Sequence, residues 1–110
     1  MRILLDECLP KDLAGELAGH QVKTVPQAGW ASISNGKLLR LIAASGKFDV
    51  FLTMDKRLPQ QNKIRGLPFA IVVLRAKSNR LEHVVPFAPL LLHRLDKFKI
   101  GNAYVLIQPD

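Results

Sequence analysis

Short runs of Ile, Val, Leu and Phe alternate along this chain with stretches whose apolar residues recur at helical spacing. The run at residues 50–53 is apolar at nearly every position, which is typical of a parallel strand covered on both faces. Strands of this kind that alternate with helices indicate βαβ units. Because the crossovers between parallel strands are right-handed, we expect a three-layer α/β/α sandwich with a mainly parallel sheet.

Five strands are predicted, at residues 2–5, 22–25, 50–53, 70–74 and 103–107. A first helix is expected to run from Pro10 to about residue 18, and a second to begin at an N-cap, Ser34, and to end at Gly46. A short helical turn is predicted at residues 60–63. Asn79 and Glu82 resemble a capping box that opens a last helix, in which Pro86 predicts a kink or a restart.

The chain has 110 residues and a hydrophobic content of 48%, so we expect one domain spanning residues 1–110 with a single core. No apolar run approaches the roughly 18 residues that a membrane helix needs, and the N-terminus lacks the pattern of a signal peptide. We therefore expect no membrane association. The single cysteine, Cys8, cannot form an internal disulfide, which favours a cytoplasmic location.

The formal net charge of +7 is unevenly distributed. Residues 1–55 contain equal numbers of basic and acidic side chains, whereas residues 56–110 contain ten Lys or Arg and three Asp or Glu. This excess favours a polyanionic partner, above all a nucleic acid, because phosphate contacts supply most non-specific affinity. The alternative is a solvated basic face that keeps a small domain soluble.

Two predicted strands lead directly into an aspartate, Asp6 after residues 2–5 and Asp55 after residues 50–53. Ligands bind at the carboxyl ends of the strands in open α/β sheets, so these acids are expected to share one crevice. Asp49 precedes its strand and therefore lies at the other end. The acids at the carboxyl ends of predicted strands are Asp6, Glu7 and Asp55. Their carboxylates suit a hard divalent cation and phosphodiester hydrolysis. Alternatively, each aspartate only ends its strand in an exposed turn.

A series of motifs runs in a fixed order along nearly the whole chain, to about Gly101. The motifs are Leu4-Leu5-Asp6-Glu7-Cys8-Leu9-Pro10, Gly19-His20-x-Val22, Gly29-Trp30-Ala31, Asn35-Gly36-x-Leu38-Leu39, Phe48-Asp49-Val50-x-x-Thr53-x-Asp55, Gln60-Gln61-Asn62 and Ala76-x-Ser78-Asn79-Arg80-Leu81-Glu82. Together they resemble a PIN-like domain family of small uncharacterised bacterial proteins, which is related to the PIN nucleases of toxin–antitoxin pairs.

The resemblance implies a Mg²⁺ or Mn²⁺ site of three or four acids, in which Asp6 matches the first ligand and Asp55 the ligand after the central strand. Relatives tend to carry Glu where this chain has Lys37, and often Asp where it has Arg57. Both departures replace an acid with a cation, so we expect a weakened metal site. A Glu at Lys37 would also complete a capping box with Ser34, so the lost acid was a cap, a ligand or both.

Polar side chains around the predicted crevice complete the candidate site. Four cations follow the Asp55 strand and are candidates for holding the phosphates of a nucleic acid: Lys56, Arg57, Lys63 and Arg65. A solvated basic loop is the alternative. Asn35 and Lys37 at the start of the second predicted helix, and Gln61 at the mouth of the crevice, are expected to modulate the site; for Gln61 an exposed polar turn is equally compatible.

The leading hypothesis is a PIN-like nuclease-type domain, a metal-dependent ribonuclease, whose catalytic and metal-binding acids are Asp6 and Asp55, with Glu7 as a further metal ligand. The alternative is a catalytically degenerate module of the same kind that binds RNA or an antitoxin-like protein without cleaving. A homodimer is a further candidate assembly. A receiver-type phosphoacceptor domain ranks below both, because the Lys expected after a late strand is lacking.

Overall fold

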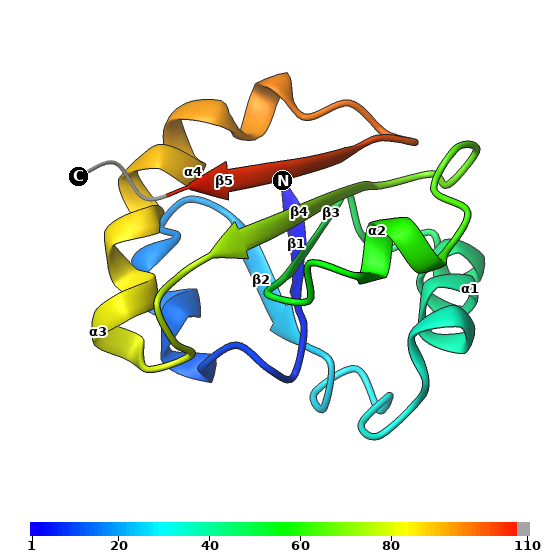
Figure 1. Ribbon diagram of the computed structural model, residues 1–110, viewed down its shortest axis with the longest axis horizontal. Coiled ribbons are helices and arrows are strands. Elements are labelled where there is room, and N and C mark those ends of the chain that lie inside the picture. Colours follow the sequence, from blue (N-terminus) through cyan, green and yellow to red (C-terminus); the bar gives the residue numbers. More distant parts are fainter. Residues whose placement is uncertain (108–110) are drawn as a thin grey trace.

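Five strands form one parallel sheet in the computed structural model, which describes residues 1–107 (Figure 1). The strands are β1 (Arg2–Leu5), β2 (Gln21–Thr24), β3 (Val50–Thr53), β4 (Ala70–Arg75) and β5 (Ala103–Ile107). Their order in the sheet is β2-β1-β3-β4-β5, and every neighbouring pair is parallel. The predicted α/β class and five-stranded parallel sheet are confirmed.

The connections between the strands are helical. They comprise the 3₁₀ helix η1 (Lys11–Glu16), α1 (Asn35–Ser45), α2 (Leu58–Gln61), α3 (Leu81–Val84), η2 (Val85–Phe87), α4 (Ala88–Arg94) and η3 (Leu95–Lys97). α1 and α2 lie on one side of the sheet in Figure 1, whereas η1 and the α3–α4 segment lie on the other. No helix within residues 1–107 is long and apolar enough to cross a membrane.

Alternation of side chains along the strands builds a separate apolar core on each face. On one face, Leu5 and Leu52 pack with Leu13 of η1 and with the buried side of α4. On the other face, Leu4 packs with residues of α1 and α2, such as Leu38. Both faces of β1, β3 and β4 are therefore covered, as the three-layer prediction requires.

Two predicted local features are wrong. The first helix is a 3₁₀ helix that ends at Glu16, because Gly15 opposes α-helix propagation and i→i+3 bonds close its turns. Ser34, by contrast, is the N-cap residue of α1 as predicted, and its side chain makes no capping hydrogen bond. The expected capping box at Asn79 does not form, because the chain enters α3 one residue later, at Arg80.

Two other local predictions are confirmed. Gly46 ends α1 in the left-handed conformation, with φ of 62°, which costs glycine little. Pro86 interrupts the last helical segment, which divides there into α3, η2 and α4.

The strand order creates a switch point between β1 and β3. From β1 the chain moves outward to β2 on one side, and it then returns to place β3 on the other side of β1. Connections that leave two adjacent strands in opposite directions open a crevice at their carboxyl ends, where ligands of doubly wound sheets bind. Asp6 follows β1, and Asp55 follows β3, at this position.

Candidate functional site

Asp6 lies at the carboxyl end of β1 and is only 7% exposed. Its backbone N–H continues the β1–β3 ladder by donating to the carbonyl of Leu52 at 2.9 Å. One carboxylate oxygen accepts a hydrogen bond from the hydroxyl of Thr53 at 2.7 Å, and the other accepts from the backbone N–H of Glu7 at 2.9 Å. The carboxylate is therefore fixed in one orientation at the switch point.

Burial raises the pKa of the Asp6 carboxyl above its ordinary value, although the hydrogen bonds from Thr53 and Glu7 oppose that rise. No Lys, Arg or His of residues 1–107 forms an ion pair with Asp6. A buried carboxyl without a cationic partner favours its protonated form and gains from the approach of positive charge.

Asp55 is half-buried and is held by residues of three elements. Its backbone N–H donates to the Thr53 hydroxyl oxygen at 3.1 Å. One carboxylate oxygen accepts from the side-chain amide of Asn35 at 3.0 Å, and the other from the backbone N–H of Arg57 at 2.9 Å. Because the Thr53 hydroxyl also donates to Asp6, a single side chain links both acids. The Thr53 hydroxyl thus joins the Asp6 carboxylate to the backbone of Asp55, whereas the proximity of the two carboxylates stays a prediction.

Glu7 is exposed and interacts with a different segment. Its carboxylate accepts a hydrogen bond from the backbone N–H of Ser32 at 2.9 Å. Ser32 has φ of 62°, a left-handed conformation that non-glycine residues seldom adopt, in the loop that leads to α1. Glu7 therefore fixes this loop. Within the described part of the chain, no three or more His, Cys, Asp or Glu side chains form a metal-holding group, so Glu7 does not complete a triad with Asp6 and Asp55.

The donor set decides which metal would fit. The carboxylates of Asp6 and Asp55 offer hard oxygen donors of the kind that Mg²⁺ and Mn²⁺ prefer. Each of these oxygens already accepts one hydrogen bond, which leaves further lone pairs. Two carboxylates suit a hydrated ion that keeps most of its waters, and they do not suit a fully coordinated one.

Lys37 lies in the first turn of α1, as predicted, and is exposed. It makes no ion pair with any acid of residues 1–107, so its approach to Asp6 or Asp55 stays a prediction. Asn35, the first residue of the same helix, does contact Asp55. Gln61 is the exposed last residue of α2.

The predicted phosphate-binding cations divide between two regions. Lys56 and Arg57 directly follow Asp55 and line hollows beside the ends of β3 and β4. Arg65 precedes Gly66, whose backbone lies near Gly101, at the amino end of β5. The structure therefore does not gather these cations into one group.

Two further cations, missed in the sequence analysis, stand beside Lys56. Arg75, the last residue of β4, and Lys77 line a hollow of about 310 Å³ with it, and Arg75 lines another of about 300 Å³ with Lys56 and Arg57. Arg75 directly follows the strand predicted at residues 70–74, and Lys77 lies two residues after β4, as Asp55 lies two residues after β3. Their position after a predicted strand was the signal in the sequence that could have identified both cations as candidates.

Cys8 does not add a nucleophile to the site. Its thiol is half-buried, and its sulfur lies 3.8 Å from the Thr53 hydroxyl. Burial, together with the nearby Asp6 carboxylate, raises the pKa of this thiol, so it stays protonated near neutral pH.

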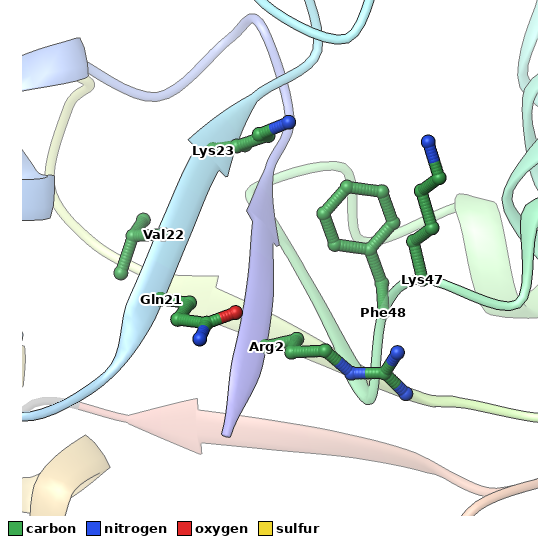
Figure 2. Close-up of a pocket in the computed structure, with 6 residues that line it drawn as sticks. All are labelled: Arg2, Gln21, Val22, Lys23, Lys47 and Phe48. Carbon is green, nitrogen blue, oxygen red and sulfur yellow. The ribbon is translucent and has the colours of Figure 1, made fainter.

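A hollow of about 530 Å³ lies away from these acids, between the amino ends of β1 and β2 and the start of β3 (Figure 2). Figure 2 shows Phe48 between Lys23 and Lys47, with Arg2 below it. The Arg2 guanidinium is already bound to the Asp49 carboxylate at 3.0 Å and to the Gly46 carbonyl. Because no Asp, Glu, His or Cys lines this hollow, the carboxyl end of the sheet is the better candidate for chemistry.

Comparisons with known proteins found no match: no family model, no curated protein and no solved structure is similar to this chain.

Proposed function

We propose that this protein is a nuclease-type domain of the PIN-like kind, which acts on RNA through a weak Mg²⁺ or Mn²⁺ site built on Asp6 and Asp55. The observation that supports the proposal is that the two acids follow adjacent strands at the switch point between β1 and β3, where the Thr53 hydroxyl bonds both the Asp6 carboxylate and the backbone N–H of Asp55. In doubly wound sheets this position is the usual place for a ligand. The proposed location is the cytoplasm.

In this proposal each neighbouring residue has a defined role. Thr53 orients Asp6, and Asn35 orients Asp55, so that both carboxylates are in place before a ligand binds. Lys56, Arg75 and Lys77 hold backbone phosphates beside the acids. A bound divalent ion would polarise the scissile phosphate and lower the pKa of a bound water.

A non-catalytic module that binds RNA or an antitoxin-like protein is the second candidate function. Specific features favour it: only two acids converge, and Lys37 and Arg57 occupy positions where relatives of the resembled family carry acids. Each substitution lowers the negative charge that would attract a divalent ion. The two functions share the same surface and differ in whether the acids bind metal.

Calorimetric titration with Mn²⁺, followed by an RNA cleavage assay, distinguishes these functions. For a nuclease, we expect Mn²⁺-dependent cleavage of single-stranded RNA by the natural chain, and loss of both Mn²⁺ binding and cleavage in Asp6→Asn and Asp55→Asn. Asp12→Asn, which changes an exposed acid in η1, is the matched control. Binding of RNA without Mn²⁺ binding would reject the nuclease in favour of the module.

A further inference from the structure

β5 has one edge without a strand partner in the described structure, and the backbone groups on that edge are free. β5 is the outermost strand on its side of the sheet, with β4 on the inner side (Figure 1). The Ile71 N–H donates to the Asn102 carbonyl, and bonding alternates along a parallel ladder. Tyr104 and Leu106 therefore bond to β4, whereas the N–H and C=O groups of Ala103, Val105 and Ile107 point outward.

Exposed apolar side chains accompany these free backbone groups. Val105 is 53% exposed and Ile107 is 64% exposed, although both belong to a strand whose Leu106 is buried. Val105 pairs with Val73, so it continues the apolar face that α1 and α2 cover farther along the sheet. An open, apolar edge is the form of strand that most readily pairs with another chain.

The opposite edge of the sheet, β2, is protected. The outward N–H of Thr24 donates to the side-chain oxygen of Gln27 at 2.9 Å, and the Thr24 carbonyl accepts from the N–H of Ala28. Gln21 and Lys23 are the exposed side chains of that strand. Capping and polar side chains are the usual means of blocking an edge, and β5 has neither at Val105.

Positive charge surrounds the open edge. A hollow of about 410 Å³ between β5 and the α4–η3 segment is lined by Arg94 and Lys97 together with Phe98, Tyr104, Val105 and Leu106. The hollow of about 300 Å³ that Lys56, Arg57 and Arg75 line also reaches Val105. No acid lines either hollow, and these cations form no ion pairs within residues 1–107.

These features select one kind of occupant. A second copy of this chain would bring like charges together across the edge. An RNA strand would match the charge but would leave the outward backbone groups and the apolar side chains of Val105 and Ile107 without suitable partners. A peptide strand with alternating apolar and acidic side chains matches the backbone, the apolar surface and the charge.

We propose that the open edge of β5 binds an extended, acidic segment of a partner protein, which adds to the sheet as a sixth strand. The added backbone would pair with Ala103, Val105 and Ile107. Apolar side chains of the segment would cover Val105 and Ile107, and its acidic side chains would face Arg94 and Lys97. This site does not include Asp6 or Asp55, although the hollow lined by Lys56 and Arg75 reaches Val105, and the proposal does not rest on the nuclease function.

A synthetic octapeptide of alternating Val and Glu, labelled for fluorescence anisotropy, is the probe. We expect saturable binding to the natural chain, and loss of binding when alternate backbone nitrogens of the peptide are methylated. Replacing its Glu with Lys is also expected to abolish binding. The methylated peptide keeps charge and side chains, so it isolates the backbone pairing.

Two variants test the site on the protein itself. Val105→Pro removes an outward N–H without breaking the β4 ladder and should weaken peptide binding at least tenfold, whereas Val105→Thr, which keeps the N–H, should bind nearly as the natural chain does. The double change Arg94→Glu, Lys97→Glu should also weaken binding at least tenfold, independently of any effect of proline on folding. Circular dichroism checks that each variant keeps its fold.

Three outcomes would overturn the proposal. The first is absence of binding by the alternating Val–Glu peptide, and the second is equal binding of its methylated form. The third is evidence for another occupant of the same edge. One such result is that oligouridylate competes with the peptide and that Val105→Pro weakens oligouridylate binding as much as peptide binding. The other is a concentration-dependent dimer of the natural chain that Val105→Pro abolishes.

Discussion

The hydroxyl of Thr53 donates a 2.7 Å hydrogen bond to the carboxylate of Asp6, across the boundary between β3 and β1. Thr53 is completely buried, and its hydroxyl oxygen also accepts from the backbone N–H of Asp55. When a buried carboxylate loses a hydrogen-bond donor, the folded state is destabilised by the full free-energy cost of desolvating that carboxylate. The two acids of the candidate site therefore depend on one hydroxyl group.

Thr53→Val should lower the free energy of unfolding by about 1.5–3 kcal/mol, the range for a hydrogen bond to a charged group. Val keeps the volume and strand preference of Thr but removes the hydroxyl. Thr53→Ser is the control, because it keeps the hydroxyl and loses a buried methyl group worth about 1 kcal/mol. Urea unfolding at neutral pH measures both. If the two variants lower the free energy of unfolding equally, the hydroxyl does not support the site.

The raised pKa of Asp6 predicts how stability depends on pH. Between its ordinary pKa of 3.8 and its higher pKa in the folded state, the folded chain binds more protons at this carboxyl than the unfolded chain does. The Asp6 contribution to the free energy of unfolding therefore falls as pH rises through that interval and is constant above it. Protonation also competes with Mn²⁺, so metal affinity should rise with pH over the same interval.

Asp6→Asn removes this titration and should flatten the fall in stability, measured by urea unfolding between pH 4 and pH 8. Asp12→Asn changes an exposed acid and should leave the profile close to that of the natural chain. A profile for Asp6→Asn that matches the natural one would contradict the assignment of this pH dependence to Asp6.

Lys37→Glu should tighten Mn²⁺ binding at least tenfold, about 1.4 kcal/mol, because it replaces a cation two residues after Asn35, which contacts Asp55, with a carboxylate. The same change adds an acid to the first turn of α1, where negative charge is favourable. Lys37→Gln removes the cation without adding a ligand and should have a smaller effect. Calorimetry that shows no change in Mn²⁺ affinity, with cleavage by the natural chain, would reject the weakened-site hypothesis.

The cations beside the site predict the salt dependence of RNA binding. Replacing Arg75 and Lys77 with Gln should make the slope of log K against log salt concentration less negative by roughly 1.4, the value for two phosphate contacts on a single strand. The matched change of Lys63 and Arg65 to Gln removes the same charge, and Arg65 lies toward the amino end of β5. Equal slopes for both pairs would show a diffuse basic face without a localised binding surface.

Local patterns were sufficient for β1 and β3, because burial on both faces forces nearly continuous apolar runs. β1, β3 and β5 have the predicted bounds, and β2 differs by one residue at each end. Local patterns were insufficient where a residue has two possible partners nearby in sequence. The capping box expected at Asn79 fitted its spacing, but Glu82 pairs instead with Arg80 at 3.2 Å.

The sequence by itself determined the class of fold and the positions of Asp6 and Asp55 after their strands, since strand periodicity and strand ends are local properties of the chain. The tertiary structure decided what these acids contact. Asn35 reaches Asp55, Glu7 turns to Ser32, and Arg75 stands beside Lys56 only because the order β2-β1-β3-β4-β5 brings distant segments together. The open edge of β5 also depends on strand order, because a strand carries no local mark of whether a neighbour will pair with it.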